Sequence, residues 1–151
     1  MKTLFYILAF TAISLSQTIS AQERPNTINS YYAIKDALIS GNANLANSTA
    51  SAFIETVTAD SSLPGQNKKA LINDASNIAG TKDIKKQRVF FSALSESLIA
   101  LSKVQKLDAN PVYHAYCPMT KSSWLSASAA IKNPYYGSAM LTCGKVVGPL
   151  K

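Results

Sequence analysis

The residues of this chain with the most capacity for chemistry lie near its C-terminal end. His114, Cys117 and Met119 fall close together, and Met140 and Cys143 form a second group further along. His114 is the only histidine, and the two cysteines are the only cysteines. No Asp or Glu follows position 108, so this segment carries no carboxylate side chain. Thiol, thioether and imidazole groups in such a segment indicate either soft-metal binding or disulfide formation.

These ligand types select among metal ions. Thiolate and thioether sulfur bind soft ions such as Cu(I), and imidazole is compatible with them. A structural zinc site usually takes four Cys or His ligands, whereas this segment holds two cysteines and one histidine. Calcium and magnesium need hard oxygen donors, which are missing here. If a metal binds through these side chains, we expect Cu(I) or the similarly soft Ag(I).

The same two cysteines allow two other states. Exported proteins commonly pair their cysteines, and a bridge from Cys117 to Cys143 would close a loop of 27 residues. Chain entropy makes such a bridge worth about 3.6 kcal/mol. The cysteines could also be two inert buried thiols. Residue types alone leave the three states open, and oxidation would interconvert the first two, because a disulfide removes the metal ligands and reduction restores them.

An enzyme is not expected. Cys117 and His114 supply a thiol and a base, but no acidic residue lies near them in sequence to orient the base. The chain has no G-x-S-x-G motif, no glycine-rich phosphate loop and no paired carboxylates at the spacing of a di-iron site. We therefore predict a binding protein with Cu(I) as the one candidate cofactor.

Four helices are expected to precede these residues. Apolar residues recur at helical spacing in four stretches, residues 28–39, 42–60, 66–79 and 81–107. Gly41 and Gly80 suit helix ends, and Asn42 and Thr81 suit N-caps. Because the connections are short, we predict an all-α fold in which residues 22–110 form an up-down four-helix bundle.

Residues 111–151 are expected to form an irregular cap that belongs to the same domain. Residues 122–131 are predicted to be a short helix, and a short β-pairing is expected around residues 140–147. Trp124 is expected to seat the cap on the bundle. In the turn Asn133-Pro-Tyr-Tyr-Gly137, the two tyrosines either fill the core or form a recognition surface.

The start of the chain has the features of a secretory signal peptide. A basic Lys2 precedes an apolar run over residues 4–15, and small residues follow up to Ala21, where cleavage is expected. Neither this run nor any later segment is long enough to span a bilayer. We therefore expect a periplasmic or secreted chain. The net charge of +7 is spread along the helices, which together with export argues against nucleic acid as a partner.

Several motifs in one order resemble a known family. They are Y-Y-A-I-K-D-A-L (31–38), R-V-F-F-S-A-L-S (88–95), V-Y-H-A-Y-C-P-M (112–119), W-L-S (124–126) and I-K-N-P-Y-Y-G-S-A-M-L-T-C-G (131–144). This set is similar to the periplasmic helical domain of unknown function that occurs alone or appended to CusB-type heavy-metal efflux adaptor subunits. Members of that family commonly carry a longer, glycine-containing insert between C-P-M and W-L-S. Only residues 120–123 intervene here, so a tighter connection is expected.

The resemblance implies handling of copper, silver or related ions outside the cytoplasm. It places Cys117, Met119, Met140 and Cys143 as metal ligands and His114 as an auxiliary ligand. The predicted function is therefore an exported Cu(I)- or Ag(I)-binding protein linked to heavy-metal handling or efflux, with an efflux adaptor or another envelope protein as partner. The alternative is a non-catalytic interaction module of an envelope complex, in which a Cys117–Cys143 disulfide locks the cap.

Overall fold

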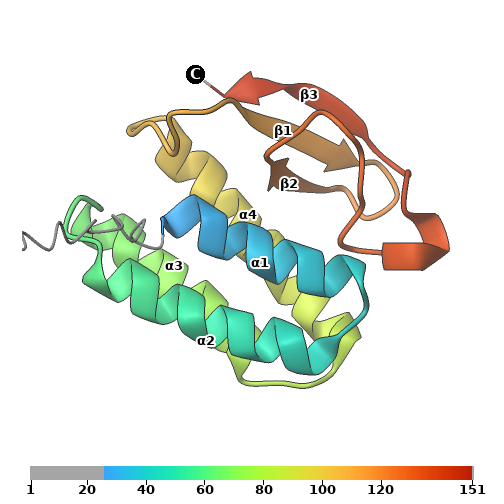
Figure 1. Ribbon diagram of the computed structural model, residues 1–151, viewed down its shortest axis with the longest axis horizontal. Coiled ribbons are helices and arrows are strands. Elements are labelled where there is room, and N and C mark those ends of the chain that lie inside the picture. Colours follow the sequence, from blue (N-terminus) through green and yellow to red (C-terminus); the bar gives the residue numbers. More distant parts are fainter. Residues whose placement is uncertain (1–25, 151) are drawn as a thin grey trace, which may run out of the picture.

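The computed structural model describes residues 26–150 and begins with four helices. They are α1 (Thr27–Ile39), α2 (Ala43–Ala59), α3 (Gly65–Ala79) and α4 (Ile84–Ser102). Consecutive helices pack on each other in antiparallel order, as Figure 1 shows. The predicted four-helix arrangement of this part of the chain is therefore confirmed.

Side-chain caps explain where three of the helices begin. The Asn26 side chain accepts a hydrogen bond from the N–H of Ile28 (3.0 Å), and the Asn42 side chain accepts one from the N–H of Leu45 (3.0 Å). The predicted cap at Asn42 is thus confirmed. The cap predicted at Thr81 is wrong, because Asp83 occupies the N-cap of α4 and accepts from the N–H of Lys85 at 2.9 Å.

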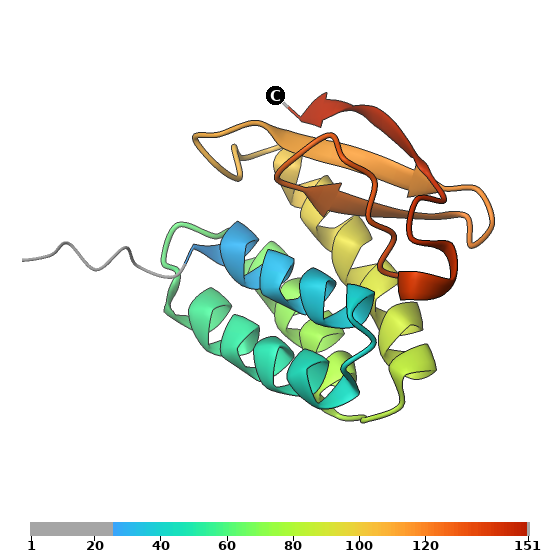
Figure 2. The same cartoon turned by 45° about the vertical axis from the view of Figure 1, so that its right-hand side comes forward.

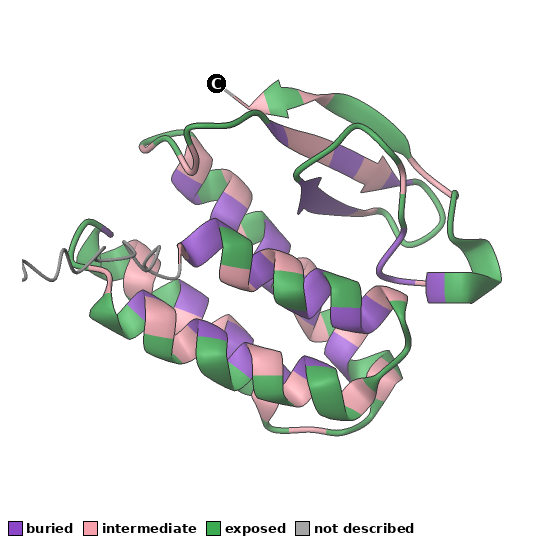
Figure 3. Cartoon of the chain, viewed as in Figure 1, coloured by how far each residue is buried: buried purple, intermediate pink, exposed green. Residues whose placement is uncertain are grey.

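The helices bury one apolar stripe each. Figure 3 shows the buried positions facing the interior of the bundle while the opposite helix faces are exposed. The largest fully buried side chains of the helices are Ile28, Tyr31, Ile34, Leu38, Phe53, Leu71, Ile78, Phe91, Leu94, Leu98 and Leu101. This spacing follows the helical period that the sequence carries, so burial of apolar surface holds the bundle together.

The region after the helices corrects the predicted fold class. It forms a three-stranded antiparallel sheet of β1 (Val112–Cys117), β2 (Ser122–Ser126) and β3 (Lys145–Leu150), in the order β2-β1-β3. The all-α class is therefore wrong, and the fold is mixed α/β with helices dominating. The short helix predicted for residues 122–131 is also wrong, since its first half is β2. The expected pairing near residues 140–147 is found further along, as β3.

The sheet is attached to the helices through β2 and aromatic side chains. Figures 1 and 2 show the sheet lying across α4 and α1, with β2 nearest the helices and β3 farthest from them. The hydroxyl of Tyr31 in α1 accepts a hydrogen bond from the N–H of Leu125 in β2 (3.0 Å) and is paired with the hydroxyl of Ser95 in α4 (2.7 Å). One buried tyrosine therefore joins α1, α4 and the sheet.

The outer strand, β3, is irregular. Its pairing with β1 shifts between His114 and Ala115, which pair with Gly148 and Val146, so Val147 is an extra residue in β3. Pro149 stands opposite Tyr113 and cannot donate a main-chain hydrogen bond. The sheet therefore has an outer edge that is bulged and carries a proline.

Two predictions concern targeting and membranes. The predicted signal peptide, residues 1–21, lies outside the described residues. Within residues 26–150, none of the helices combines the length and the apolar character that a bilayer crossing requires.

Candidate functional site

The structure brings the two cysteines together. Cys117 is the last residue of β1, and Cys143 lies two residues before β3 begins. Because Tyr116 pairs with Lys145, the chain at Cys143 runs alongside the end of β1. Both side chains are free thiols, and they lie close enough together that Cys117 raises the pKa of Cys143. Cys117 is fully buried, whereas Cys143 is partly exposed.

The two thiols differ in the direction in which their pKa values are shifted. Burial raises the pKa of the Cys117 thiol, but donor groups of Thr120, Asn133 and the Met119 main chain stabilise the thiolate, and the net pKa lies below its usual value. Burial and the neighbouring Cys117 raise the pKa of the Cys143 thiol. Cys117 is therefore the thiol that ionises first, and Cys143 retains its proton to higher pH.

A glycine allows the chain to pass close to β1 beside the thiols. Gly144 has a φ of +147°, and a Cβ at this position would lie 2.7 Å from the Trp124 ring and 3.1 Å from the carbonyl oxygen of Tyr116. The first distance is too short for a Cβ and the second is tight, so a larger residue would force the Trp124 ring or the strand to shift. The glycine that follows Cys143 thus favours the close passage of this segment along β1.

Asn133 holds the loop that carries Cys143. It is fully buried, and its side-chain N–H donates to the carbonyl oxygen of Cys143 at 2.7 Å. Its side-chain oxygen accepts from the N–H groups of Tyr135 (2.8 Å) and Tyr136 (3.3 Å), and its main-chain N–H donates to the carbonyl oxygen of Leu141 (2.7 Å). One side chain therefore fixes both ends of the loop and positions Cys143 against Cys117.

Tyr135 and Trp124 fill the space between the loop, the sheet and the helices. The Tyr135 ring lies 6.1 Å from the rings of both Phe91 and Trp124, and its hydroxyl donates to the carbonyl oxygen of Ser123. Trp124 is almost fully buried. The predicted role of Trp124 as the anchor of the C-terminal region is confirmed, and Tyr135 is a core side chain and not part of a recognition surface.

The loop also rests on the end of α1. The short helix η1 (Gly137–Met140) follows the tyrosines. Gly137 has a φ of +56°, and a Cβ there would lie 2.7 Å from the Arg88 guanidinium and 2.8 Å from the carbonyl oxygen of Ile39. The guanidinium itself donates to the carbonyl oxygen of Leu38 at 3.0 Å. Arg88 therefore caps α1 directly beneath the loop, and only glycine fits above it.

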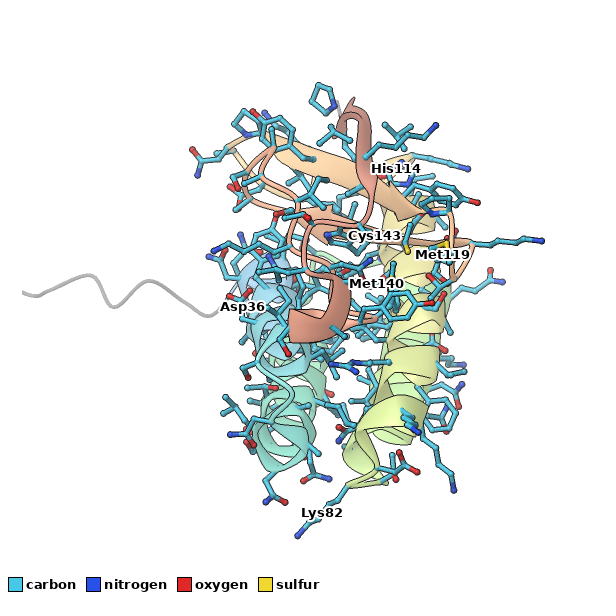
Figure 4. All side chains as sticks on the ribbon, turned by 90° about the vertical axis from the view of Figure 1, so that its right-hand side faces the viewer. Asp36, Lys82, His114, Met119, Met140 and Cys143 are labelled. Atoms are coloured by element: carbon cyan, nitrogen blue, oxygen red, sulfur yellow. The ribbon has the colours of Figure 1, made fainter. Side chains whose placement is uncertain are left out.

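Both methionines lie next to the thiol pair and point toward solvent. Met119 contributes its main chain to the surroundings of Cys117, and its residue is 62% exposed. The carbonyl oxygen of Met140 accepts from the N–H of Cys143 at 3.1 Å, and Met140 is 37% exposed. Figure 4 shows Met119, Met140 and Cys143 on the same side of the molecule. Two exposed thioethers therefore flank the thiols.

His114 does not join this group. It lies three residues before Cys117 on β1, and alternate residues of a strand face opposite sides of the sheet. Burial lowers the pKa of His114, and the charge of Glu96 on α4 opposes that shift. Its Nε2 atom is buried without a hydrogen-bond partner. The predicted auxiliary ligand is thus separated from the thiols by the sheet.

Across residues 26–150, no three side chains of His, Cys, Asp or Glu gather as a metal site would require. Any ion at the thiol pair would therefore take its further ligands from thioether sulfur or from solvent. Sequence reasoning named both cysteines and both methionines as candidate ligands. It missed Thr120 and Asn133, although an Asn before Pro in a turn motif is a signal for side-chain hydrogen bonds to the main chain.

Comparisons with known proteins concern mainly the helical part. No curated protein and no solved structure matches the chain. Residues 27–110 match the family described as "Protein of unknown function (DUF3347)". The match covers α1 to α4 and ends before β1, so the thiol pair lies beyond the matched residues. Because the match spans more than half of the 151 residues, this chain is a member of the DUF3347 family.

Proposed function

We propose that this protein binds a soft monovalent ion, Cu(I) or Ag(I), through the sulfur atoms of Cys117 and Cys143. The observation that supports the proposal is the proximity of the two thiols, because the pairing of Tyr116 with Lys145 brings Cys143 beside the end of β1, where Cys117 lies. Soft ions prefer thiolate ligands, and a pair that is already assembled loses little conformational freedom on binding.

The surroundings favour a soft ion over a harder one. No carboxylate lies in the sequence beyond position 108, and no third His, Cys, Asp or Glu joins the pair among the described residues. Zinc, calcium and magnesium would all lack ligands in such a site. Met119 and Met140 can supply thioether sulfur from exposed positions beside the thiols, which would extend the ligand set in a way that suits Cu(I) and Ag(I).

The exposure of the site suits an ion that is transferred between proteins. Cys143 is partly exposed and both methionines reach solvent, so a partner that offers sulfur ligands could approach the ion directly. We therefore extend the proposal to an exported protein that captures or passes the ion in the cell envelope, with an efflux adaptor or another envelope protein as partner. The resemblance to domains appended to CusB-type adaptors supports this extension.

Anaerobic titration of the reduced protein with Cu(I), against a competing chelator, tests the proposal. We expect one ion per chain, and we expect the variant Cys117→Ser, Cys143→Ser to bind no more than background. Met119→Leu should weaken binding if its thioether is a ligand, whereas His114→Gln should leave the affinity unchanged, because the ring lies across the sheet. Equal binding by the wild type and the double-serine variant would end the proposal.

A second function is favoured by the same proximity of the two thiols. A disulfide between Cys117 and Cys143 would lock the C-terminal region, and the protein would then serve as a non-catalytic interaction module of an envelope complex. The mass of the protein purified from its native compartment without reductant separates the two functions. A chain lighter by two hydrogen atoms is expected for the module, and free thiols are expected for the metal-binding protein.

A further inference from the structure

The two sulfur atoms differ in their access to solvent. Cys117 is fully buried at the end of β1, while Cys143 is partly exposed on the loop in front of it. We propose that this pair is a site of ordered thiol–disulfide exchange with small disulfides, in which Cys143 reacts first with the external disulfide and Cys117 then closes the protein disulfide. The inference does not require that the site binds a metal.

The exchange takes place in two steps. Cys143 has the higher pKa of the two thiols, but its sulfur is the one that an external disulfide can reach. After losing its proton, the Cys143 thiolate attacks one sulfur of the external disulfide RSSR, the S–S bond breaks, and the leaving RS⁻ takes up the proton that Cys143 has lost. The Cys117 thiolate then attacks the Cys143 sulfur of the mixed disulfide. The bond between Cys143 and SR breaks, and the second RS⁻ takes up the proton lost by Cys117. Two protein thiols are oxidised, and one external disulfide is reduced to two RSH.

Burial sets the order. An external disulfide must reach the attacking sulfur, and Cys117 offers no surface to solvent. The same burial does not hinder the second step, because the pairing of β1 with β3 brings Cys143 beside Cys117. That step is intramolecular between neighbouring groups, so it is expected to be much faster than the first. The mixed disulfide should therefore be short-lived in the wild-type protein.

The backbone permits the final bond. Tyr116 and Lys145 are paired residues of adjacent antiparallel strands, and Gly144 passes close to the Tyr116 carbonyl oxygen. Adjacent strands lie about 5 Å apart, which is within the range of Cα separations that a disulfide spans. The protein disulfide can therefore form without separating β1 from β3.

The charge around Cys143 selects the class of disulfide. The exposed side chains of Lys121 and Lys145 flank the two segments that carry the thiols, and Lys132 is exposed on the same loop as Cys143. Residues 109–150 carry no Asp or Glu side chain. An anionic disulfide such as oxidised glutathione should accumulate near these lysines, and a cationic disulfide such as cystamine should be repelled. The preferred substrate is thus a small anionic disulfide.

The test follows metal-free, fully reduced protein with oxidised glutathione by intact-mass spectrometry. We expect the wild type to form the protein disulfide with no accumulated adduct. Cys117→Ser should accumulate one glutathione on Cys143. Cys143→Ser should react at Cys117 at least about tenfold more slowly than Cys117→Ser reacts at Cys143, since buried groups react only through local opening. In urea the two variants should react at similar rates, which shows that burial causes the difference.

Two results would overturn the order of attack. One is an equally fast reaction at Cys117 in folded Cys143→Ser, and the other is a persistent adduct in the wild type. Circular dichroism identifies a variant that has not folded, and Cys117→Ala then replaces Cys117→Ser. For each disulfide, the reaction rate with the folded protein is divided by the rate with the protein unfolded in urea. Equal ratios for oxidised glutathione and cystamine would overturn the preference for an anionic disulfide. Because no metal is present, these results are independent of the Cu(I) titration.

Discussion

Asn133 is the residue on which the geometry of the thiol pair depends most. Its side chain and main chain fix Cys143, Leu141, Tyr135 and Tyr136, and its amide also stabilises the Cys117 thiolate. The main-chain groups of Cys143, Tyr135 and Tyr136 and the Cys117 thiolate would lose this partner if the side chain were removed, whereas the bond to Leu141 comes from the main chain and would remain. Asn133 therefore couples the stability of the loop to the ionisation of Cys117.

We expect Asn133→Ala to lower the free energy of unfolding by about 2–3 kcal/mol, because several main-chain groups lose their partners. It should also raise the pKa of Cys117, because the thiolate loses a donor. Urea unfolding measures the first effect, and thiolate absorbance as a function of pH measures the second. Lys132→Ala, at the exposed neighbouring position, is the matched control and should change stability by less than about 0.5 kcal/mol.

His114 makes the stability depend on pH. Burial lowers its pKa in the folded state below the ordinary value of 6.5, so the unfolded chain binds a proton more readily. The free energy of unfolding should therefore fall as pH falls from 6.5 toward the folded-state pKa, and level off below it. Because His114 is the only histidine, urea unfolding of His114→Gln should lose this slope. The same slope in both proteins would contradict the assignment.

At this scale the sequence showed which side chains could bind a soft ion, but not which residues hold them in place. The soft side chains of Cys117, Met119, Met140 and Cys143 could be identified by type, and the structure groups them around one end of β1. Asn133 could not be recognised as their support, because its partners are main-chain groups as far away as Cys143. A hydrogen bond to a main-chain group does not require a particular residue type at the partner position, so the sequence does not reveal it.

The elements show why the spacing of His114 and Cys117 in the sequence could not predict how the two side chains lie. In an irregular segment, a spacing of three residues places no restriction on where two side chains point. Once β1 is a strand, its alternation of faces puts His114 and Cys117 on opposite sides of the sheet. The incorrect all-α prediction and the predicted auxiliary ligand therefore share one cause, which is the missed strand.

The helices were predictable and the strands were not, for a physical reason. A helix is built from local hydrogen bonds, and caps such as Asn42 mark its ends in the sequence. A strand is stabilised by partners distant in sequence. β2 is also buried on both faces from Ser123 to Ser126, so it lacks the alternation of polar and apolar residues that identifies a half-exposed strand. Its Ser- and Ala-rich continuation then favoured a helix.

The contact between η1 and α1 allows a matched pair of glycine substitutions. Gly137 and Gly41 both have positive φ values, +56° and +72°, but only Gly137 has neighbours within reach of a Cβ. We expect Gly41→Ala to cost about 1–2 kcal/mol, which is the backbone penalty alone. Gly137→Ala should cost more than Gly41→Ala, because Arg88 and Ile39 must also move. Urea unfolding measures both, and equal costs would exclude a tight contact beneath the loop.

Considered as a whole, the molecule has one apolar core shared by the helices and the sheet. Trp124, Leu125 and Tyr135 belong to the same buried cluster as Tyr31 and Phe91. The aromatic contacts run from Tyr31 to Phe91 (4.9 Å) and on to Tyr135 and Trp124. A change at the thiol pair should therefore alter the stability of the entire fold and not only that of the sheet.

Oxidation of the thiol pair tests this coupling. A Cys117–Cys143 disulfide closes a loop of 27 residues, so the oxidised protein should be more stable than the reduced protein by up to about 3.6 kcal/mol. Urea unfolding with and without reductant, followed by helix content, measures the gain. The double variant Cys117→Ser, Cys143→Ser should show no response to reductant. A gain confined to the sheet, with unchanged helix unfolding, would argue against a shared core.

The outer strand has a consequence for the protein in concentrated solution. A regular free strand edge invites the same edge of another copy to pair with it, and repeated pairing leads to fibrils. In β3 the extra Val147 bends the edge, Pro149 removes a donor, and exposed Lys145 adds charge at its start. Two exposed valines can therefore sit at this edge without inviting strand pairing, so the chain can stay dispersed while the neighbouring Cys143 remains accessible.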